Sequence, residues 1–185
     1  MTMQVDTQPA TAGANTSWEQ RFVETIIVRC NNDKGLAARL RRADNPATEY
    51  QSWEVLGALG VDLEKDYQRL PFAAVAAAIA KFKADRNGRL TLGRAIAACY
   101  EDRNQSAQAK ARLRRLLACD ELAEACRILR PILTLIDSKV GQPIDFVRLL
   151  RQLRNFHFDG QRVKTQWAQE FYGQPMQDKE KEATT

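Results

Sequence analysis

Residues that ligate metals are scarce in this sequence. It contains one histidine, His157, and its four cysteines include no C-x-x-C pair. Histidine cages are thereby excluded, and the cysteine spacing does not support a zinc site. Apolar helical patterns surround all four cysteines, Cys30, Cys99, Cys119 and Cys126, as is typical of buried, reduced thiols in a cytosolic protein. We therefore expect the protein to bind no metal and no cofactor.

The common catalytic signatures are also absent. The sequence has no G-x-x-x-x-G-K-[ST] loop, no G-x-G-x-x-G turn and no G-x-S-x-G elbow. His157 stands between Phe156 and Phe158, so we expect it to pack at the end of a helix. The acidic residues are scattered over amphipathic patterns, and many fall at predicted helix ends, where capping and the helix dipole account for them. We predict a protein that is not an enzyme.

Long hydrophobic runs are missing as well. The most apolar stretch, residues 72–80, is rich in alanine and far too short to cross a bilayer. The N-terminus lacks the charged and apolar regions of a signal peptide. These absences predict a cytoplasmic protein without a membrane partner.

Helical periodicity, in contrast, is present along most of the chain. Apolar residues recur every three or four positions, and no convincing alternating strand pattern occurs. The fold class is therefore predicted to be all-α, with roughly nine helices in compact bundles. We expect residues 1–16 to form a disordered polar segment, 17–172 a helical domain, and 173–185 a disordered acidic tail.

Several helix starts can be predicted from capping residues and prolines. Ser17, Ser106, Asp120 and Asp145 each precede an apolar pattern and are predicted N-caps. Pro46 and Pro71 are each expected to open a helix, since the first helical position needs no N–H donor. After Asp145, two separate apolar patterns predict two final helices.

The basic residues are mostly arginine. The sequence has 28 Lys plus Arg against 23 Asp plus Glu, a net charge of +5, and 19 of the basic residues are arginine. The planar guanidinium of arginine donates bidentate hydrogen bonds to phosphate and stacks on bases. An excess of arginine therefore favours an anionic partner. A GC-rich genome would also enrich arginine, so composition alone leaves both explanations open.

Arginines recur at helical spacing on three of the predicted helices, opposite leucine stripes. Only six carboxylates lie from Asp120 through Asp159 to pair with them. Such rows would together build one basic strip that contacts nucleic-acid backbone without reading sequence. The alternative is a helical adaptor whose basic surface binds an acidic protein. The residues of these rows are Arg112, Arg114, Arg115, Arg127, Arg130, Arg148, Arg151 and Arg154.

Two short motifs resemble a known family. Leu40-Arg41-Arg42-Ala43 is followed shortly by Pro46, and Leu90-Thr91-Leu92-Gly93-Arg94-Ala95-Ile96-Ala97 comes later in the chain. Together with the arginine-rich helices, they are similar to the CasB family, the small subunit of type I-E CRISPR Cascade. The resemblance covers about residues 18–171. The longer polar N-terminus and the acidic C-terminal extension depart from the family pattern.

The resemblance implies two packed helical sub-bundles and a non-catalytic subunit of a crRNA-guided antiviral complex. Two copies would lie beside other Cascade subunits and hold opened target DNA, especially the displaced strand, with the target strand or crRNA as further contacts. Arg41, Arg42 and Arg94 match the motifs and carry over as nucleic-acid contacts, and Arg112 and Arg130 fall at corresponding basic positions. Arg94 has an alternative role in an internal ion pair.

Overall fold

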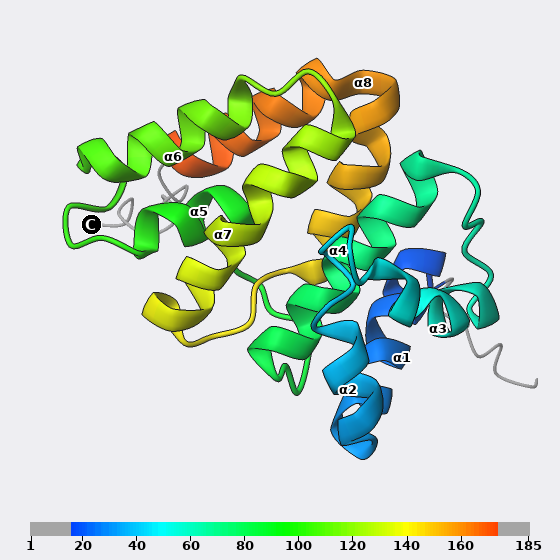
Figure 1. Ribbon diagram of the computed structural model, residues 1–185. Coiled ribbons are helices and arrows are strands. Elements are labelled where there is room, and N and C mark those ends of the chain that lie inside the picture. The colour runs from blue at the N-terminus through cyan, green and yellow to red at the C-terminus, as the bar shows by residue number, and fades with distance from the viewer. Residues whose placement is uncertain (1–15, 174–185) are drawn as a thin grey trace, which may run out of the picture.

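Eight α-helices and two short 3₁₀ helices make up the part of the chain that the computed structural model describes, residues 16–173 (Figure 1). Within that range the β pairing is a single isolated bridge between Leu90 and Ile144. The helices are α1 (Trp18–Asn32), α2 (Lys34–Leu40), η1 (Glu49–Ser52), α3 (Trp53–Ala58), α4 (Asp66–Phe82), α5 (Leu92–Ala98), η2 (Arg103–Gln105), α6 (Ala107–Leu117), α7 (Leu122–Val140) and α8 (Phe146–Tyr172).

The all-α prediction is therefore confirmed. The expectations for residues 1–15 and 174–185 lie outside the described residues. Among residues 16–173, no helix is both long enough and apolar enough to cross a membrane.

The helices form two groups that share one core. Helices α1, α2 and α3 gather around α4, while α5 and α6 pack with α7 and α8 (Figure 1). Helix α4 contacts both α7 and α8, and its residues 71–80 are all buried. A single continuous hydrophobic cluster consequently runs through both groups, since the alanines of α4 allow neighbouring helices to approach closely.

Three of the predicted N-caps are confirmed. Ser17 Oγ accepts a hydrogen bond from the N–H of Gln20 at 3.3 Å, and Ser106 Oγ accepts one from Ala109 at 3.3 Å. Asp145 Oδ1 accepts the N–H of Arg148 at 3.0 Å. Each bond satisfies a backbone donor that the first turn of a helix leaves without an intrahelical partner.

The fourth predicted cap is wrong. Helix α7 begins at Leu122 with Glu121 in the cap position, and no side chain caps it. Asp120 instead accepts a hydrogen bond from Lys164 Nζ at 3.0 Å, on the far end of α8. A partner that is distant in sequence has replaced the local capping bond.

Both proline predictions are wrong as well. Pro46 lies in a turn in which Asn45 Oδ1 accepts the N–H of Ala47 at 3.1 Å, and the next α-helix begins at Trp53. Pro71 lies inside α4, which begins five residues earlier at Asp66. The Pro71 ring is buried in the core, so packing compensates for the backbone hydrogen bond that proline cannot donate.

The two predicted final helices are two segments of α8. Asp159 interrupts that helix with φ −147° and ψ 65°, and its Oδ1 accepts the N–H of Arg162 at 3.1 Å. It therefore acts as a cap for the second segment, whose Val163, Trp167 and Phe171 are buried as the periodicity predicted.

Candidate nucleic-acid interface

Five basic side chains from three helices surround one cleft of about 730 Å³. We call it the basic cleft. Its remaining lining residues are Ala111, Ile128, Pro131, Ile132 and Thr134, so no carboxylate lines it. The five basic residues are Lys81 of α4, Arg112 and Arg115 of α6, and Arg127 and Arg130 of α7.

Helix amphipathicity places these arginines. On α6, Leu113 and Leu116 are buried, which turns Arg112 and Arg115 outward, one helical turn apart. On α7, Ile128 and Leu129 are among the buried residues, and Arg127 and Arg130 repeat the same three-residue spacing. Because α6 packs against α7, the two arginine rows border the same cleft.

Some of the cleft's cations are held in place by hydrogen bonds. Arg112 Nε donates to the hydroxyl of Tyr100 at 2.6 Å. Arg130 Nη1 donates to the backbone carbonyl of Asp44 at 3.4 Å, and Lys81 Nζ pairs with the carboxylate of the same residue at 2.5 Å. These bonds fix the position of each head group while leaving other N–H donors available.

The guanidinium groups of the other two cleft arginines are less restrained by neighbouring residues. Arg127 pairs with Glu124 at 3.4 Å, but both side chains are largely exposed and such pairs contribute little. Arg115 is exposed, and its guanidinium makes no hydrogen bond or ion pair with any described residue. Arg115 and Arg127 can therefore turn toward an anion at small cost.

Arg41 and Arg42 lie beside this region, in the turn that follows α2. Arg41 Nε donates to the carbonyl of Ala80, the residue before Lys81, at 3.2 Å. Arg42 Nη1 reaches Gln51 Oε1 at 3.5 Å. Both side chains are exposed, and neither pairs with a carboxylate among the described residues, so they extend the positive charge beyond Lys81.

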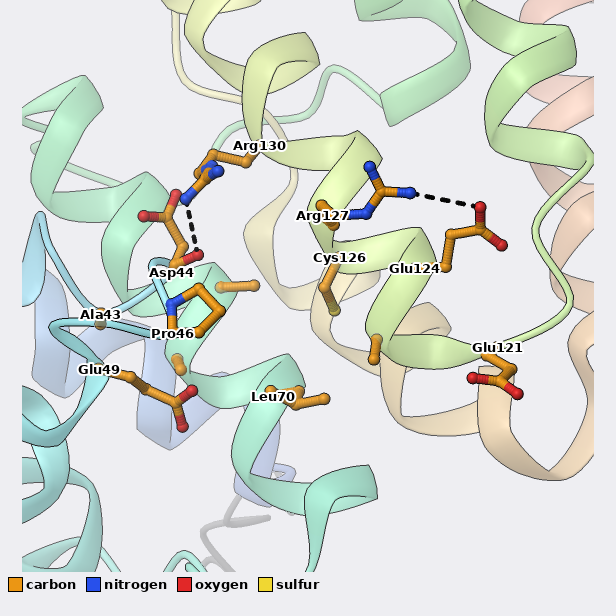
Figure 2. A pocket seen from close by; sticks show the side chains of 13 residues that line it. Ala43, Asp44, Pro46, Glu49, Leu70, Glu121, Glu124, Cys126, Arg127 and Arg130 are labelled. Atoms are coloured by element: carbon orange, nitrogen blue, oxygen red, sulfur yellow. Dashed lines mark hydrogen bonds and ion pairs between the residues drawn. The ribbon is translucent and has the colours of Figure 1, made fainter.

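A second hollow of about 610 Å³ adjoins the basic cleft and shares Arg127 and Arg130 with it. Figure 2 shows Arg130 pointing toward Asp44, and Arg127 pointing toward Glu124 of the same helix. Helix α4 contributes Leu70, Ala73 and Ala74 to the lining of this hollow. The carboxylates that line the hollow are Asp44, Glu49, Glu121 and Glu124. Negative charge therefore borders the basic cleft on this side.

The remaining predicted arginines do not line the basic cleft. Arg114 is exposed on α6, outside the cleft lining, and its guanidinium makes no bond to a described residue. Arg151 Nη2 donates to Ser17 Oγ at 2.8 Å. Arg154 pairs with Glu19 and lies over the Trp18 ring, 4.9 Å from its centroid.

Arg94 and Arg148 lie together in another pocket, between α5 and α8. Arg148 Nε donates to Glu170 Oε1 at 2.6 Å, and the Glu170 side chain is only 6% exposed. Arg94 is exposed and pairs with no described carboxylate, so no internal ion pair of the kind considered for it occurs within residues 16–173.

The sequence did not indicate two residues on which the cleft depends. Lys81, which lines the cleft, lies in the last turn of the alanine-rich α4 and belongs to no arginine row. Tyr100 does not line the cleft but accepts a hydrogen bond from Arg112, and it follows α5. Neither residue carries a local signal, because each acquires its role only through the packing of helices.

Potential metal ligands and the single histidine were the other candidates for chemistry. Within residues 16–173, no group of three or more histidine, cysteine or acidic residues could hold a metal ion. His157 is exposed and stacks on Tyr67 with ring centroids 5.2 Å apart, just before the kink in α8.

The cysteines are unpaired thiols. Burial raises the pKa of Cys30 to about 11 and that of Cys126 to about 12. We expect native Cys30 and Cys126 to react with iodoacetamide at pH 8 at least about 100-fold more slowly than in the urea-unfolded chain, because the thiolate is the reacting form. Mass spectrometry of quenched samples measures both rates, and equal rates would contradict this expectation.

Comparisons with known proteins agree with this architecture. The sequence matches the family of CRISPR-associated protein Cse2 over residues 36–172. No curated protein matches it. Among solved structures, M. ruber CasB superposes with a TM-score of 0.67 and 28% identity, covering 85% of this chain and 94% of that chain.

Two further crystal structures are similar. A Cse2-family protein from Thermus thermophilus gives a TM-score of 0.68 at 25% identity, with 84% of this chain and 98% of that chain covered. CasB from Thermobifida fusca gives 0.67 at 17% identity, with coverages of 86% and 100%, and supports the fold alone. The residues matched by the family include the whole basic cleft.

Proposed function

Since the chain belongs to the CRISPR-associated Cse2 family, we propose that it is a non-catalytic Cascade subunit that binds nucleic-acid backbone through the basic cleft. The other Cascade subunits are its protein partners, and two copies act side by side. In this role the cleft stabilises opened target DNA by holding the displaced strand.

The observation that carries this proposal is the composition of the basic cleft. Five cationic side chains line it and no carboxylate does. Lys81 and Arg127 pair with Asp44 and Glu124, which lie outside the lining, and the three other cations pair with no described carboxylate. An isolated row of surface arginines is usually only a solvated face. Cations from three helices around one concave surface instead create a local positive potential that attracts phosphates.

The geometry supports backbone binding in preference to base reading. Arg112 and Arg130 are held by Tyr100 and by the Asp44 carbonyl, so they offer fixed donors to phosphate oxygens. Arg115 and Arg127 can adjust to the path of a flexible strand. Phosphate contacts of this kind fix position without selecting sequence, which suits a complex in which guide pairing supplies specificity.

The energetics of strand exchange explain why a few phosphate contacts are enough to stabilise opened target DNA. An RNA–DNA hybrid is about as stable as the DNA duplex that it replaces. A few phosphate contacts on the displaced strand can therefore shift the balance toward the open state. The acidic residues of the adjoining hollow would repel phosphates, so we expect the strand to leave the cleft near Arg127 and Arg130.

The cleft can be tested with a pair of charge-matched double variants. In Arg115→Gln/Arg127→Gln we expect affinity for single-stranded DNA to fall roughly tenfold, and the slope of log affinity against log salt to flatten by about 1.4. The slope flattens because each lost phosphate contact reduces the number of counterions that are released when the DNA binds. Fluorescence anisotropy of a labelled oligonucleotide over a salt series measures both quantities.

The matched control is Arg114→Gln/Arg21→Gln. Both guanidinium groups are exposed, lie outside the basic cleft and make no bond to a described residue, and Arg114 is the immediate neighbour of Arg115. This variant has the same net charge and should keep the natural slope. Equal losses in both variants would overturn the assignment to the cleft. A slope near zero for the natural chain, with protein partners that remain bound after nuclease treatment, would favour the adaptor role instead.

A further inference from the structure

The hollow that adjoins the basic cleft carries the opposite charge at one end, and we call it the acidic hollow. It measures about 610 Å³, within the range of roughly 300–1,000 Å³ that is typical of ligand-binding pockets. Its lining includes four carboxylates and two arginines, Arg127 and Arg130. We propose that the acidic hollow is a docking site for a partner protein, which inserts an arginine side chain together with its neighbouring apolar residues.

Small side chains create the space in the acidic hollow. Ala73 and Ala74 of α4 line it beside Leu70, and Ala123 joins them from the first turn of α7. An arginine has an apolar stem and a charged head, so its stem can cover such a surface while its guanidinium stays near carboxylates. A wholly apolar segment would leave those carboxylates without a counter-charge.

The charges are separated along the acidic hollow. Figure 2 shows Arg127 and Arg130 at one end, which the hollow shares with the basic cleft, and Glu49 and Glu121 at the other. Arg127 pairs with Glu124, and Arg130 pairs with no described carboxylate. Neither arginine therefore offsets the charge at the far end, where a cationic side chain meets negative potential.

Glu49 gives the strongest indication of a ligand. The residue is only 7% exposed, and its Oε1 accepts bonds from Arg69 Nε at 2.6 Å and from Trp53 Nε1 at 3.4 Å. Its Oε2 makes no hydrogen bond to a described residue. Within residues 16–173 the one buried side-chain N or O atom without a partner is Thr91 Oγ1, so Glu49 Oε2 is open to solvent in the hollow that the residue lines. A nearly buried carboxylate thus keeps one oxygen for a donor from outside.

Asp44 has the same arrangement. Its side chain is 9% exposed, its Oδ2 pairs with Lys81, and its Oδ1 has no partner among the described residues. Cys126 also lines the hollow, and burial, followed by the negative charges of Glu49 and Asp44, raises the pKa of its thiol to about 12. The hollow is therefore negative around this thiol, although Lys81 and Arg69 pair with the two carboxylates.

Glu121 adds an accessible charge at the rim of the acidic hollow. It is exposed, and its side chain makes no hydrogen bond or ion pair with any described residue. A guanidinium presents five N–H donors in a planar fork that matches carboxylate oxygens. Arginine is therefore a better fit than lysine, whose ammonium is a compact point charge.

Docking at the acidic hollow is separate from the DNA contact of the basic cleft. The displaced strand does not suit the hollow, because its carboxylates repel phosphates. That the partner is another Cascade subunit rests on the function proposed above. The docking of an arginine-bearing segment does not.

The test is an NMR titration of the full chain with two capped peptides, acetyl-Ala-Arg-Ala-amide and acetyl-Ala-Gln-Ala-amide, at equal ionic strength. The arginine peptide should shift the amide signals of Ala74 and Cys126 in a saturable manner, whereas the glutamine peptide should not. We expect a dissociation constant in the millimolar range, because the peptide supplies a single anchored side chain.

Three charge-matched variants locate the binding. Glu49→Gln should weaken binding of the arginine peptide roughly tenfold, because hydrogen bonds to a buried charge are strong. Glu121→Gln should weaken it about threefold, since an exposed charge is screened by solvent. Glu101 is exposed, makes no bond to a described residue and lies outside the hollow, so Glu101→Gln should bind like the natural chain. Circular dichroism checks the fold of Glu49→Gln, and the exposed Glu121 provides the test if that variant unfolds.

A second arm measures hydrogen exchange of the full chain, alone and assembled with the other Cascade subunits. Protection of the amides of residues 122–126 on assembly identifies one of those subunits as the partner. Peptide binding without this protection supports the hollow as a docking site for a different protein. Both results are independent of the DNA-binding test of the basic cleft.

The proposal is overturned if the two peptides shift the amides of Ala74 and Cys126 equally. It is also overturned if Glu49→Gln, shown to be folded, and Glu121→Gln bind the arginine peptide as tightly as the natural chain does. If the same amides shift when the chain alone is concentrated, the occupant is a second copy, and the assignment to a partner protein is wrong.

Discussion

Replacing Gly93 by alanine is expected to lower the free energy of unfolding by about 3 kcal/mol. A Cβ at this position would lie 2.5 Å from the Phe171 nitrogen, 2.6 Å from Glu170 Cβ and 2.6 Å from the Trp167 carbonyl oxygen. Two of these atoms belong to the backbone of α8, which cannot move aside as a flexible side chain can. Helices α5 and α8 would have to separate, and their shared core would lose contacts.

Thermal unfolding followed by circular dichroism measures this effect. For a chain of this length, a loss of 3 kcal/mol corresponds to a midpoint lower by about 6 to 12 °C. Gly57→Ala is the matched control, since that helical glycine is exposed and its new Cβ would meet only Leu63 Cδ1 at 3.6 Å. Alanine there should be neutral or slightly stabilising. Similar midpoints for the two variants would contradict the close packing at Gly93.

This packing divides the Leu-Gly-Arg-Ala motif into two parts. Gly93 is required by the contact between two helices, whatever the protein binds. Arg94, the next residue, points to the surface, and its side chain has no structural partner among residues 16–173. A loss of nucleic-acid binding in a Gly93 variant would consequently report on folding, whereas a loss in an Arg94 variant would report on a direct contact of that side chain.

The features that the sequence predicted correctly are local. Ser17, Ser106 and Asp145 cap their helices because the hydrogen bond joins residues three apart. The buried stripes of α6 and α8 follow from a period of 3.6 residues, which needs no knowledge of the neighbouring helices. The all-α fold class rests on the same kind of information.

The features that the sequence missed depend on distant partners. Asp120 was available as a cap, but Lys164 lies 44 residues away and pairs with it instead. Pro71 was expected to begin a helix, yet Asp66 and Arg69 form an ion pair that stabilises an earlier turn of α4. Local propensity is a weak preference that tertiary contacts override.

The arginine rows show the same limit in the candidate site. Counting carboxylates from Asp120 to Asp159 suggested that few were available for pairing, but Arg148 pairs with Glu170 and Arg154 with Glu19. Both partners lie outside the counted window. Helical spacing correctly placed Arg112 with Arg115 on one face, and only the packing of α6 against α7 brought them to Arg127 and Arg130.

Glu170 is expected to be the most sensitive polar residue of the described chain. Its buried carboxylate joins Arg148, the Gln152 amide and the Gly93 N–H, and Gln152 in turn accepts a bond from Trp167 Nε1 at 2.9 Å. Removing it in Glu170→Ala takes the carboxylate acceptor away from the buried amide of Gln152 and from the N–H of Gly93. We expect a loss of about 3 kcal/mol in the free energy of unfolding, measured by urea denaturation.

A surface ion pair provides the control for that loss. Arg39 and Glu54 are also joined at 3.0 Å, but the Glu54 side chain is 80% exposed, so Glu54→Ala should change stability by less than about 0.5 kcal/mol. The contrast separates burial from charge pairing, because both variants break one arginine–glutamate pair. Equal losses would mean that the ion pair itself, and not the satisfied buried network, stabilises the contact between α5 and α8. A large loss at Glu170 alone would assign a structural role to Arg148, the ion-pair partner of that carboxylate.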